Sequence, residues 1–297
     1  MGKVSFIILT YNTTELTLQC ISSVKQHVEG LSCEFIVVDN GSRLSERSAL
    51  EMQLAKDCRL VKSAQNVGFG GGNMLGANFA TGDYLCFLNS DIVFEEDCVS
   101  PLIKELEQDS SIGCITPQQY DGYHRFVRSF NHEHSILNKA ISKSLLERLF
   151  PSKYPSRKTC YKEPFVVHNI NGCFMLFPAD AFWECGGFDV NIFLYCEEYD
   201  VAMRMQKKGY KMVVDPRYSF LHLQGQSCGK SYRLTRREGF ISDLYTYRKY
   251  HNIFAWFFYW LIMFVKILPK VKIWYVLPVM MEGGGLSRSM RHLNYLK

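Results

Sequence analysis

Three short polar clusters follow apolar runs early in the chain, and their side chains could bind a ligand. The clusters are Thr10-Tyr11-Asn12, Asp39-Asn40 and Asn89-Ser90-Asp91. The carboxyl ends of parallel strands meet at one edge of a sheet, and ligands lie beyond that edge, so the pattern predicts a nucleotide site. The alternative is that Asp39 and Asp91 only cap helices, at about 1 kcal/mol each. Two carboxylates that each follow a buried strand favour the ligand site.

A second group of carboxylates, Glu197, Glu198 and Asp200, directly precedes or begins an expected helix. Asp200 lies four residues before Arg204, so a structural ion pair is its natural interpretation. Glu197 and Glu198 have no partner at that spacing, which leaves these two carboxylates available for chemistry.

Further along, His222 stands in the segment HLQGQS, and Arg233, Arg236 and Arg237 follow it. A single histidine is more often a core or surface residue than a ligand. The arginines could clamp a phosphate, because a guanidinium matches phosphate oxygens. A solvated basic face is the alternative for these arginines.

Strands that alternate with helices must position these residues. Continuous apolar runs predict buried strands, and apolar residues three or four apart predict helices. The expected strands are 4–9, 35–38, 59–62 and 84–88, and the expected helices are 14–28, 45–55, 70–80 and 98–107. This alternation predicts an α/β fold with a mostly parallel sheet.

The rest of the chain is less regular. Residues 124–162 lose the alternation, which indicates an insertion or flexible loop beside the site. Residues 169–187 return to a strand followed by a helix, and residues 195–209 indicate another helix.

The charge is divided unevenly along the 297 residues, although the formal net charge is only +5. The net charge is −8 over residues 1–123, +7 over 124–162, −3 over 163–228 and +9 over 229–297. No nucleic-acid-binding signature accompanies the basic blocks, so we expect no nucleic-acid partner. The glycine run at 68–72 does not follow the first strand, which argues against a dinucleotide-dependent dehydrogenase.

Eleven cysteines, an odd number without a Cys-x-x-Cys pair, indicate buried free thiols in a reducing cytosol. The N-terminal residues show a strand pattern and no signal-peptide architecture.

Residues 253–265 form an uncharged apolar run that is shorter than the ~20 residues of a membrane-spanning helix. Three tryptophans and three lysines lie in or just after this run, and these residue types favour the membrane interface. We therefore expect an amphipathic anchor in the plane of a membrane. The alternative is a helix that packs on the protein's own core.

The order of the segments VSFIILTYN, FIVVDNGS, NVGFGGGNMLGANFATGDYLCFLNSDI and NGCFMLFPADAFWECGGFDVNIFLYCEEYDVAMRMQKKGY resembles the family 2 inverting glycosyltransferases. The nearest similarity is to the bacterial rhamnosyltransferase-like subgroup of polysaccharide and O-antigen assembly. The resemblance covers about residues 3–230. It implies a GT-A fold: a Rossmann-like, mostly parallel sheet flanked by helices, followed here by a C-terminal amphipathic helical segment.

The resemblance also implies roles for single residues. The nucleotide-binding residues would be Thr10, Tyr11, Asn12, Asp39, Asn66, Gly68, Asn73, Asn89 and Ser90. Asp91 takes the last position of the family's Asp-x-Asp metal motif, and Asn89 replaces the first aspartate. Asp91 and His222 would hold a Mg²⁺ or Mn²⁺ ion, which neutralises the diphosphate leaving group.

The family places its catalytic base in a Glu-Asp pair at the start of the acceptor-side helix. Here the pair is Glu197-Glu198, so the resemblance assigns the base to Glu198, with Glu197 as second candidate and Asp200 in support.

Taken together, these features predict a metal-dependent inverting hexosyltransferase. It would move one sugar, such as L-rhamnose from a dTDP donor, to a lipid-diphosphate-linked saccharide in cell-surface polysaccharide synthesis. A UDP-hexose or UDP-galactofuranose donor, or a nucleotide-sugar-binding protein without catalysis, is the alternative. We expect a cytoplasmic protein, peripheral on the inner face of the cell membrane.

The expected division of the chain is a catalytic domain at 1–230 and a basic, aromatic-rich, membrane-facing tail at 231–297. Within the catalytic domain, residues 1–123 would bind the nucleotide-sugar, 124–162 form the basic insertion, and 163–230 form the acceptor and catalytic part.

Overall fold

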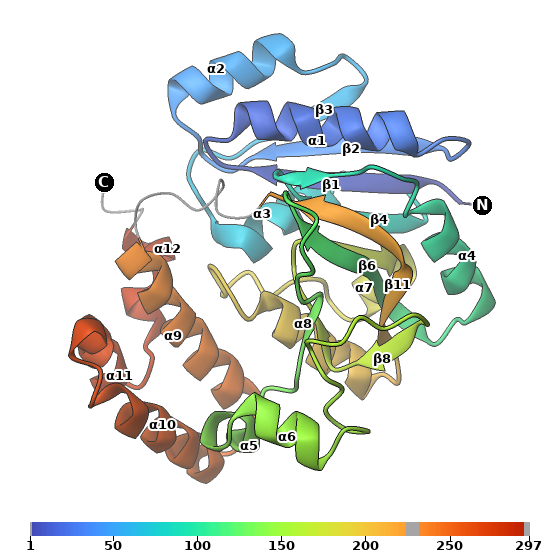
Figure 1. Ribbon diagram of the computed structural model, residues 1–297. Helices are drawn as coiled ribbons and strands as arrows, with labels where there is room; N and C mark the ends of the chain where they lie inside the picture. Colours follow the sequence, from blue (N-terminus) through green and yellow to red (C-terminus); the bar gives the residue numbers. More distant parts are fainter. Residues whose placement is uncertain (1, 224–231, 294–297) are drawn as a thin grey trace.

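The structure, a computed structural model, describes residues 2–223 and 232–293 (Figure 1). Its main sheet runs in the order β3-β2-β1-β4-β10-β6-β11-β5, and β8 pairs with β11 beside this path. The strands of this sheet are β1 (Val4–Thr10), β2 (Cys33–Asp39), β3 (Cys58–Lys62), β4 (Tyr84–Asn89), β5 (Ile92–Val93), β6 (Ile112–Asp121), β8 (Phe165–Val167), β10 (Phe174–Pro178) and β11 (Lys211–His222). A separate two-stranded sheet pairs β7 (Phe130–Asn131) with β9 (Asn169–Ile170).

The sheet is mixed but mostly parallel. β1 is parallel to β2 and β4, and β2 is parallel to β3. β10 runs antiparallel to both β4 and β6, so β6 has the direction of β4, and β11 is parallel to β6. Six strands therefore end at one edge, as the sequence predicts for the first four.

Helices cover both faces of this sheet. The helices that precede residue 210 are α1 (Thr14–His27), α2 (Leu44–Gln53), α3 (Gly68–Ala77), α4 (Ser100–Gln108), α5 (Ile136–Ala140), α6 (Lys143–Leu149), α7 (Ala179–Glu184) and α8 (Glu197–Lys207). Alternate residues of β1 point to opposite faces. Phe6 and Ile8 pack in a core with α1, α2 and α4, whereas Ile7 packs in a second core with α3, α7 and α8. The outcome is a three-layer α/β fold.

One expectation from the sequence needs correction, and one is made more definite. The stretch 124–162 is not only a loop, because α5 and α6 form within it and α5 contacts α10 (Ile253–Ile267). Glu197, Glu198 and Asp200 lie inside the first turn of α8, at the start of the helix expected over 195–209. The N-terminus of a helix favours acidic side chains, which explains this position.

The C-terminal part has a small core of its own, beside the sheet and α8 (Figure 1). It consists of α9 (Tyr232–Tyr250), α10 (Ile253–Ile267), η1 (Val271–Val276), α11 (Leu277–Met281), η2 (Leu286–Arg288) and α12 (Met290–Leu293). One face of α10 is buried through Tyr259, Met263 and Ile267. Its other face is exposed, so the alternative of a helix packed on the protein's own core is confirmed for one face, and the membrane anchor stays a prediction.

No helix in residues 2–223 and 232–293 combines the length and the apolar character that crossing a membrane requires. The ten cysteines described by the structure are free thiols, and most are buried, as expected.

Candidate functional site

The strand register brings the residues of the predicted ligand site to one edge of the sheet. Thr10 lies opposite Asp39, and Leu9 lies opposite Asn89. His222 ends β11 opposite Asp121 of β6, at the same edge. The first three polar clusters and His222 therefore border one region of the molecule.

Hydroxyl groups connect the loops after β1 and β4. Thr17 Oγ1 donates to Thr10 Oγ1 at 2.8 Å, and Thr10 Oγ1 lies 3.1 Å from Thr13 Oγ1. Thr13 Oγ1 lies 3.0 Å from Ser90 Oγ. Thr10 and Ser90 are buried in this chain of contacts and hold the loops after β1 and β4 in place. The neighbouring Tyr11 ring is exposed.

Asp39 is fully buried and both of its carboxylate oxygens accept hydrogen bonds. The Ser42 backbone N–H donates to Oδ1 at 2.9 Å, and Arg47 Nε donates to Oδ2 at 2.5 Å. Asn12 adopts a left-handed φ of 57° and accepts from the Arg43 backbone N–H through its side chain at 2.8 Å. These bonds connect the loops that follow β1 and β2, and Asp39 accepts within the turn before α2 without capping that helix, whose N-cap residue is Arg43.

Asn66 and Gly68 lie at the same edge, in a network centred on Asn40. Asn40 Nδ2 donates to Asn66 Oδ1 at 3.1 Å and to the Gly68 carbonyl at 3.0 Å. Gly68 has a φ of +86°, and a Cβ there would lie 2.2 Å from the Phe193 carbonyl oxygen, so glycine is required. The Phe69 N–H donates to that same carbonyl at 2.7 Å.

Asn73, one turn further along α3, is buried and donates to the Phe69 carbonyl at 3.1 Å. Its Oδ1 has no partner among the described residues. Because a buried acceptor without a partner is costly, this oxygen is available to a donor group at the edge.

Asp91 and His222, the two residues predicted to hold a metal ion, lie together: His222 Nε2 lies 3.1 Å from Asp91 Oδ1. Gln119 Nε2 lies 2.8 Å from the other ring nitrogen of His222 and fixes the ring. Burial, the largest single cause, lowers the pKa of His222, but the hydrogen bonds and charge interactions with Asp91 and Cys173 together raise it to about 10. A divalent cation between the two donor atoms would take the place of this imidazole proton.

The donor set fits a cation that the ligand helps to bind. Within the described residues, no three His, Cys, Asp or Glu side chains gather as a complete metal site. One carboxylate and one imidazole suit Mg²⁺ or Mn²⁺ when diphosphate oxygens supply other ligands. Asn89, at the first motif position, has its backbone N–H bonded to the Cys173 carbonyl at 2.9 Å.

Glu197 and Glu198 begin α8 after a strained turn in which Tyr195 and Cys196 have left-handed φ values of 66° and 69°. Burial, followed by the charge of Glu198, raises the pKa of Glu197 well above its usual range. Glu197 Oε2 has no partner among the described residues. Glu198 is half-buried, and burial raises its pKa to about 7. A carboxylate with this pKa is suited to accept a proton near neutral pH.

Asp200 is held in a separate cluster. Its Oδ2 accepts from Arg204 Nη2 at 2.6 Å, and its Oδ1 accepts from Lys249 Nζ at 2.6 Å and from Tyr250 Oη at 2.6 Å. The predicted Asp200–Arg204 ion pair is confirmed. With both oxygens engaged, Asp200 joins α8 to α9 and acts as a positioning residue.

Gln119 and Cys173 were missed by the sequence reasoning. Cys173 Sγ lies 3.5 Å from Gln119 Oε1. Gln119, which contacts the His222 ring, is therefore itself held by a buried residue of the core. The available signal was Gln118-Gln119 directly after the apolar run of β6, which is the pattern of the three polar clusters.

The arginines after His222 separate in space. Arg233 lies over the Tyr275 ring at 5.8 Å, Arg236 lines a cavity, and Arg237 has its Nε and Nη2 buried without a partner in the described part of the chain. Gln224, Gly225, Gln226 and Ser227 of the HLQGQS motif lie outside the described residues.

Comparisons with known proteins show which family and which fold the chain has. The chain is 29% identical over 147 residues to rhamnosyltransferase WbbL of Escherichia coli K12, covering 48% of this chain and 53% of that protein. It is 24% identical to poly-beta-1,6-N-acetyl-D-glucosamine synthase of Staphylococcus epidermidis, covering 72% of this chain and 48% of that protein. The chain thus spans about half the length of these curated relatives.

Among solved structures, the mannosyltransferase PcManGT of Pyrobaculum calidifontis, in complex with GDP-Man and Mn²⁺, has a TM-score of 0.57 at 15% identity. The match covers 95% of this chain and 74% of that one, and it shows that the fold is of the GT-A type. The family model described as glycosyl transferase family 2 matches residues 5–186. Since this match covers more than half of the chain, the protein belongs to glycosyl transferase family 2.

Proposed function

We propose that this protein is an inverting glycosyltransferase that moves one sugar from a nucleotide-diphosphate donor to an acceptor hydroxyl. The observation that carries the proposal is the position of Glu198, a half-buried carboxylate in the first turn of α8, whose pKa burial raises. It begins a helix whose preceding loop packs, through Phe193, on the start of α3 at the ligand edge.

In the proposed reaction, Glu198 accepts the proton of the acceptor hydroxyl as that oxygen attacks the anomeric carbon. The bond from this carbon to the diphosphate oxygen breaks at the same time, and its electron pair leaves with the nucleoside diphosphate. Attack from the side opposite the leaving group inverts the anomeric configuration.

Asp91 and His222 would hold the Mg²⁺ or Mn²⁺ ion, which supplies charge neutralisation for the leaving diphosphate. Support comes from their 3.1 Å contact and from the Mn²⁺ that accompanies GDP-Man in the PcManGT complex. The residues at the ends of β1, β2 and β4, together with Asn66, Gly68 and Asn73, would border the nucleoside.

For the donor we propose dTDP-L-rhamnose, supported by the similarity to WbbL; a UDP-hexose or UDP-galactofuranose is the alternative. The acceptor would be a lipid-diphosphate-linked saccharide of a cell-surface polysaccharide. The relatives' names concern rhamnosyl transfer and a glucosamine polymer, which supports the polysaccharide setting.

We also propose that the tail at 231–297 faces the inner surface of the cell membrane, while residues 1–230 carry catalysis. The exposed face of α10 presents Phe254, Phe258, Leu261, Val265 and Leu268, at intervals of four and three residues. These residues form one stripe of the helix. Residues 244–281 contain no Asp or Glu but do contain Lys266, Lys270 and Lys272, which suit an anionic lipid surface.

The test uses the purified protein with Mg²⁺ or Mn²⁺ and a panel of nucleotide sugars. The proposal predicts hydrolysis or transfer with at least one donor, and loss of turnover in EDTA. Binding of a donor without any turnover would instead favour the second candidate, a non-catalytic nucleotide-sugar-binding protein. The replacement of the motif's first aspartate by Asn89 favours that candidate.

A further inference from the structure

The segment 189–200, which carries the two glutamates, is held at both ends by α9 of the tail. At its first residue, Asp189 Oδ2 accepts from Tyr245 Oη at 3.0 Å and from Lys249 Nζ at 2.7 Å. At its last residue, Asp200 Oδ1 accepts from the same Lys249 Nζ at 2.6 Å. The ammonium group of Lys249 therefore joins the two ends of the segment to one point of α9.

The middle of the segment is held through two consecutive backbone carbonyls. The Phe193 carbonyl accepts from the Phe69 backbone N–H of α3 at 2.7 Å, at the ligand edge of the sheet. The next carbonyl, that of Leu194, accepts from the hydroxyl group of Ser242 of α9 at 2.8 Å. Two different elements thus fix neighbouring peptide groups, and these contacts restrict the direction that the chain takes after them.

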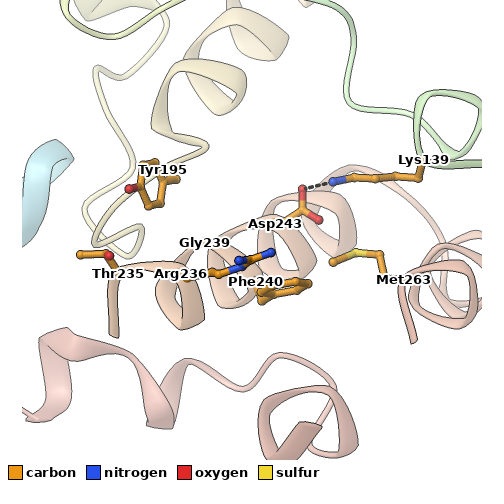
Figure 2. Close-up of a pocket in the computed structure, with 8 residues that line it drawn as sticks. All are labelled: Lys139, Tyr195, Thr235, Arg236, Gly239, Phe240, Asp243 and Met263. Carbon is orange, nitrogen blue, oxygen red and sulfur yellow. Dashed lines mark hydrogen bonds and ion pairs between the residues drawn. The ribbon is translucent and has the colours of Figure 1, made fainter. Parts of the chain in front are cut away.

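The left-handed turn of Tyr195 and Cys196 follows directly, and α8 begins at Glu197. Residues other than glycine rarely adopt a positive φ, and such conformations persist only where the surrounding structure determines them. The Tyr195 ring packs on α9, since a Cβ on Gly239 would lie 3.2 Å from it. Figure 2 shows Tyr195 beside α9, at a cavity of about 360 Å³ that both border. Contacts from α9 therefore support the turn that directs the two glutamates.

The residues of α9 that make these contacts share one face of the helix. Ser242, Tyr245 and Lys249 lie at intervals of three and four residues. Leu244 and Tyr247 lie instead in the core of the tail, together with residues of α10. One face of α9 thus serves the segment that carries the glutamates, and another serves the helix with the exposed apolar stripe.

We propose that Ser242 and Lys249 are positioning residues for Glu198, so that α9 belongs to the catalytic unit although it lies in the tail. The Ser242 hydroxyl fixes the peptide before the turn, and Lys249 keeps the two ends of the segment together. Both side chains act by holding the Glu198 carboxylate where the acceptor hydroxyl must arrive. This proposal rests on the proposed glycosyl transfer, and it adds residues outside 1–230 that the reaction requires.

The first test compares kcat and donor affinity in the wild type and in Ser242→Ala. A small displacement of a reacting group lowers the rate strongly, so we expect kcat to fall by about tenfold or more. The donor dissociation constant should change by less than about twofold, because the nucleotide edge is untouched. An unchanged kcat in a folded Ser242→Ala variant would overturn the proposal.

Lys249→Met, which keeps an apolar stem without the charge, is the second variant and keeps the test valid if Ser242→Ala does not fold. It removes the common donor to Asp189 and Asp200, so kcat should again fall by about tenfold or more at nearly constant donor affinity. A kcat equal to that of the wild type in the folded Lys249→Met variant would also overturn the proposal.

Ser23→Ala is the matched control. Ser23 of α1 is buried and its hydroxyl donates to the Cys20 carbonyl at 2.8 Å, so this change also deletes a buried hydrogen bond from a hydroxyl to a carbonyl. It should lower the unfolding temperature but leave kcat unchanged. An equal loss of kcat in Ser23→Ala and Ser242→Ala would mean that Ser242 has only a general structural role, and the proposal would be overturned.

Hydrogen–deuterium exchange separates this proposal from the proposed function, because it requires no turnover. In Ser242→Ala, the backbone amides of 195–200 should exchange at least about threefold faster than in the wild type, whereas those of β1 should not change. If no donor is turned over but exchange rises in this way, glycosyl transfer fails and the support of the segment by α9 stands. If the wild type turns over a donor but kcat and exchange are both unchanged in Ser242→Ala, only the positioning role is wrong.

Discussion

The two adjacent glutamates of α8 differ in their exposure to solvent. This difference is the reason why we propose Glu198, and not Glu197, as the base. Glu197 is 5% exposed and has an oxygen without a partner among the described residues, whereas Glu198 is half-buried. The sequence places both at the start of the helix. It does not show their exposure, because burial depends on the loop before α8 and on the helices of the tail.

The pKa of Glu198 predicts the pH dependence of the reaction. Because the raised pKa of about 7 keeps the carboxyl protonated in acid, the base form is present only above that pH. We expect kcat/KM to fall about tenfold per pH unit below pH 7, measured as initial rates in constant ionic strength. A flat profile from pH 5 to 8 would contradict this role.

Glu197 predicts an effect on stability. Its pKa is raised in the folded state, so the folded chain holds this proton more tightly than the unfolded chain does. Its contribution to stability is present below the unfolded pKa and is lost as pH rises through the folded pKa.

Glu197→Gln should therefore gain stability relative to the wild type as pH rises from 5 to 8, measured by thermal unfolding. Glu163→Gln, a change at an exposed position outside the site, is the control. If the difference in unfolding temperature between Glu197→Gln and the wild type were the same at every pH, the result would contradict this prediction.

At the scale of elements, the early strands and helices could be predicted because their apolar periodicity is uninterrupted. β1 and α1 have the expected positions within one or two residues. β6 and β11 were missed because polar residues and prolines interrupt them. β11 contains Asp215 and Pro216, and its register with β6 shifts there. That irregular strand carries His222, so the metal pair followed from the resemblance and not from periodicity.

Asp200 connects two elements, and its removal should separate them. It is fully buried and joins α8 to Lys249 and Tyr250 of α9. Asp200→Ala removes a fully buried carboxylate that accepts from the partly exposed Arg204 and Lys249 and from Tyr250, so we expect a loss of about 2 kcal/mol in the free energy of unfolding. Chemical denaturation measures this loss. Asp57→Ala, which removes an exposed pair with Lys25, should cost about 1 kcal/mol or less and is the control.

The contact between Asp91, which follows β4, and His222, at the end of β11, joins the two strand ends. If the two residues hold a metal ion, that ion should change the affinity of the protein for the nucleotide. In the wild type, Mn²⁺ should raise the affinity for the donor's nucleoside diphosphate. Asp91→Asn should remove most of that increase, because it withdraws the charged oxygen from the cation. The measurement is calorimetry of nucleoside diphosphate binding with and without Mn²⁺. If Mn²⁺ increased the affinity equally in the wild type and in Asp91→Asn, this metal site would be excluded.

At the scale of the whole molecule, acidic residues and basic or exposed apolar residues lie in different parts of the chain. The strand-end segments carry the carboxylates, while residues 229–297 have a net charge of +9 and the exposed stripe on α10. The division was visible in the sequence. Which face of α10 is exposed was not, since this depends on α5 and α9 packing against the other side.

This surface predicts binding to anionic vesicles. Phe254→Ser with Phe258→Ser removes side chains that are 75% and 56% exposed, so vesicle co-sedimentation should weaken by at least about tenfold while folding is kept. Met52→Ser, at a 79% exposed position on α2, should have no effect. Binding that is insensitive to salt, or unaffected by the double change, would exclude a basic apolar membrane surface here.

The central claim is that Glu198 removes the acceptor proton. The most direct test compares kcat and donor affinity in the wild type and in Glu198→Gln, with Glu197→Gln beside it. The account predicts that Glu198→Gln lowers kcat by about 10²–10⁴-fold while the donor dissociation constant changes by less than about twofold. A kcat within a few fold of wild type would contradict the claim, and a large loss only in Glu197→Gln would move the base to Glu197.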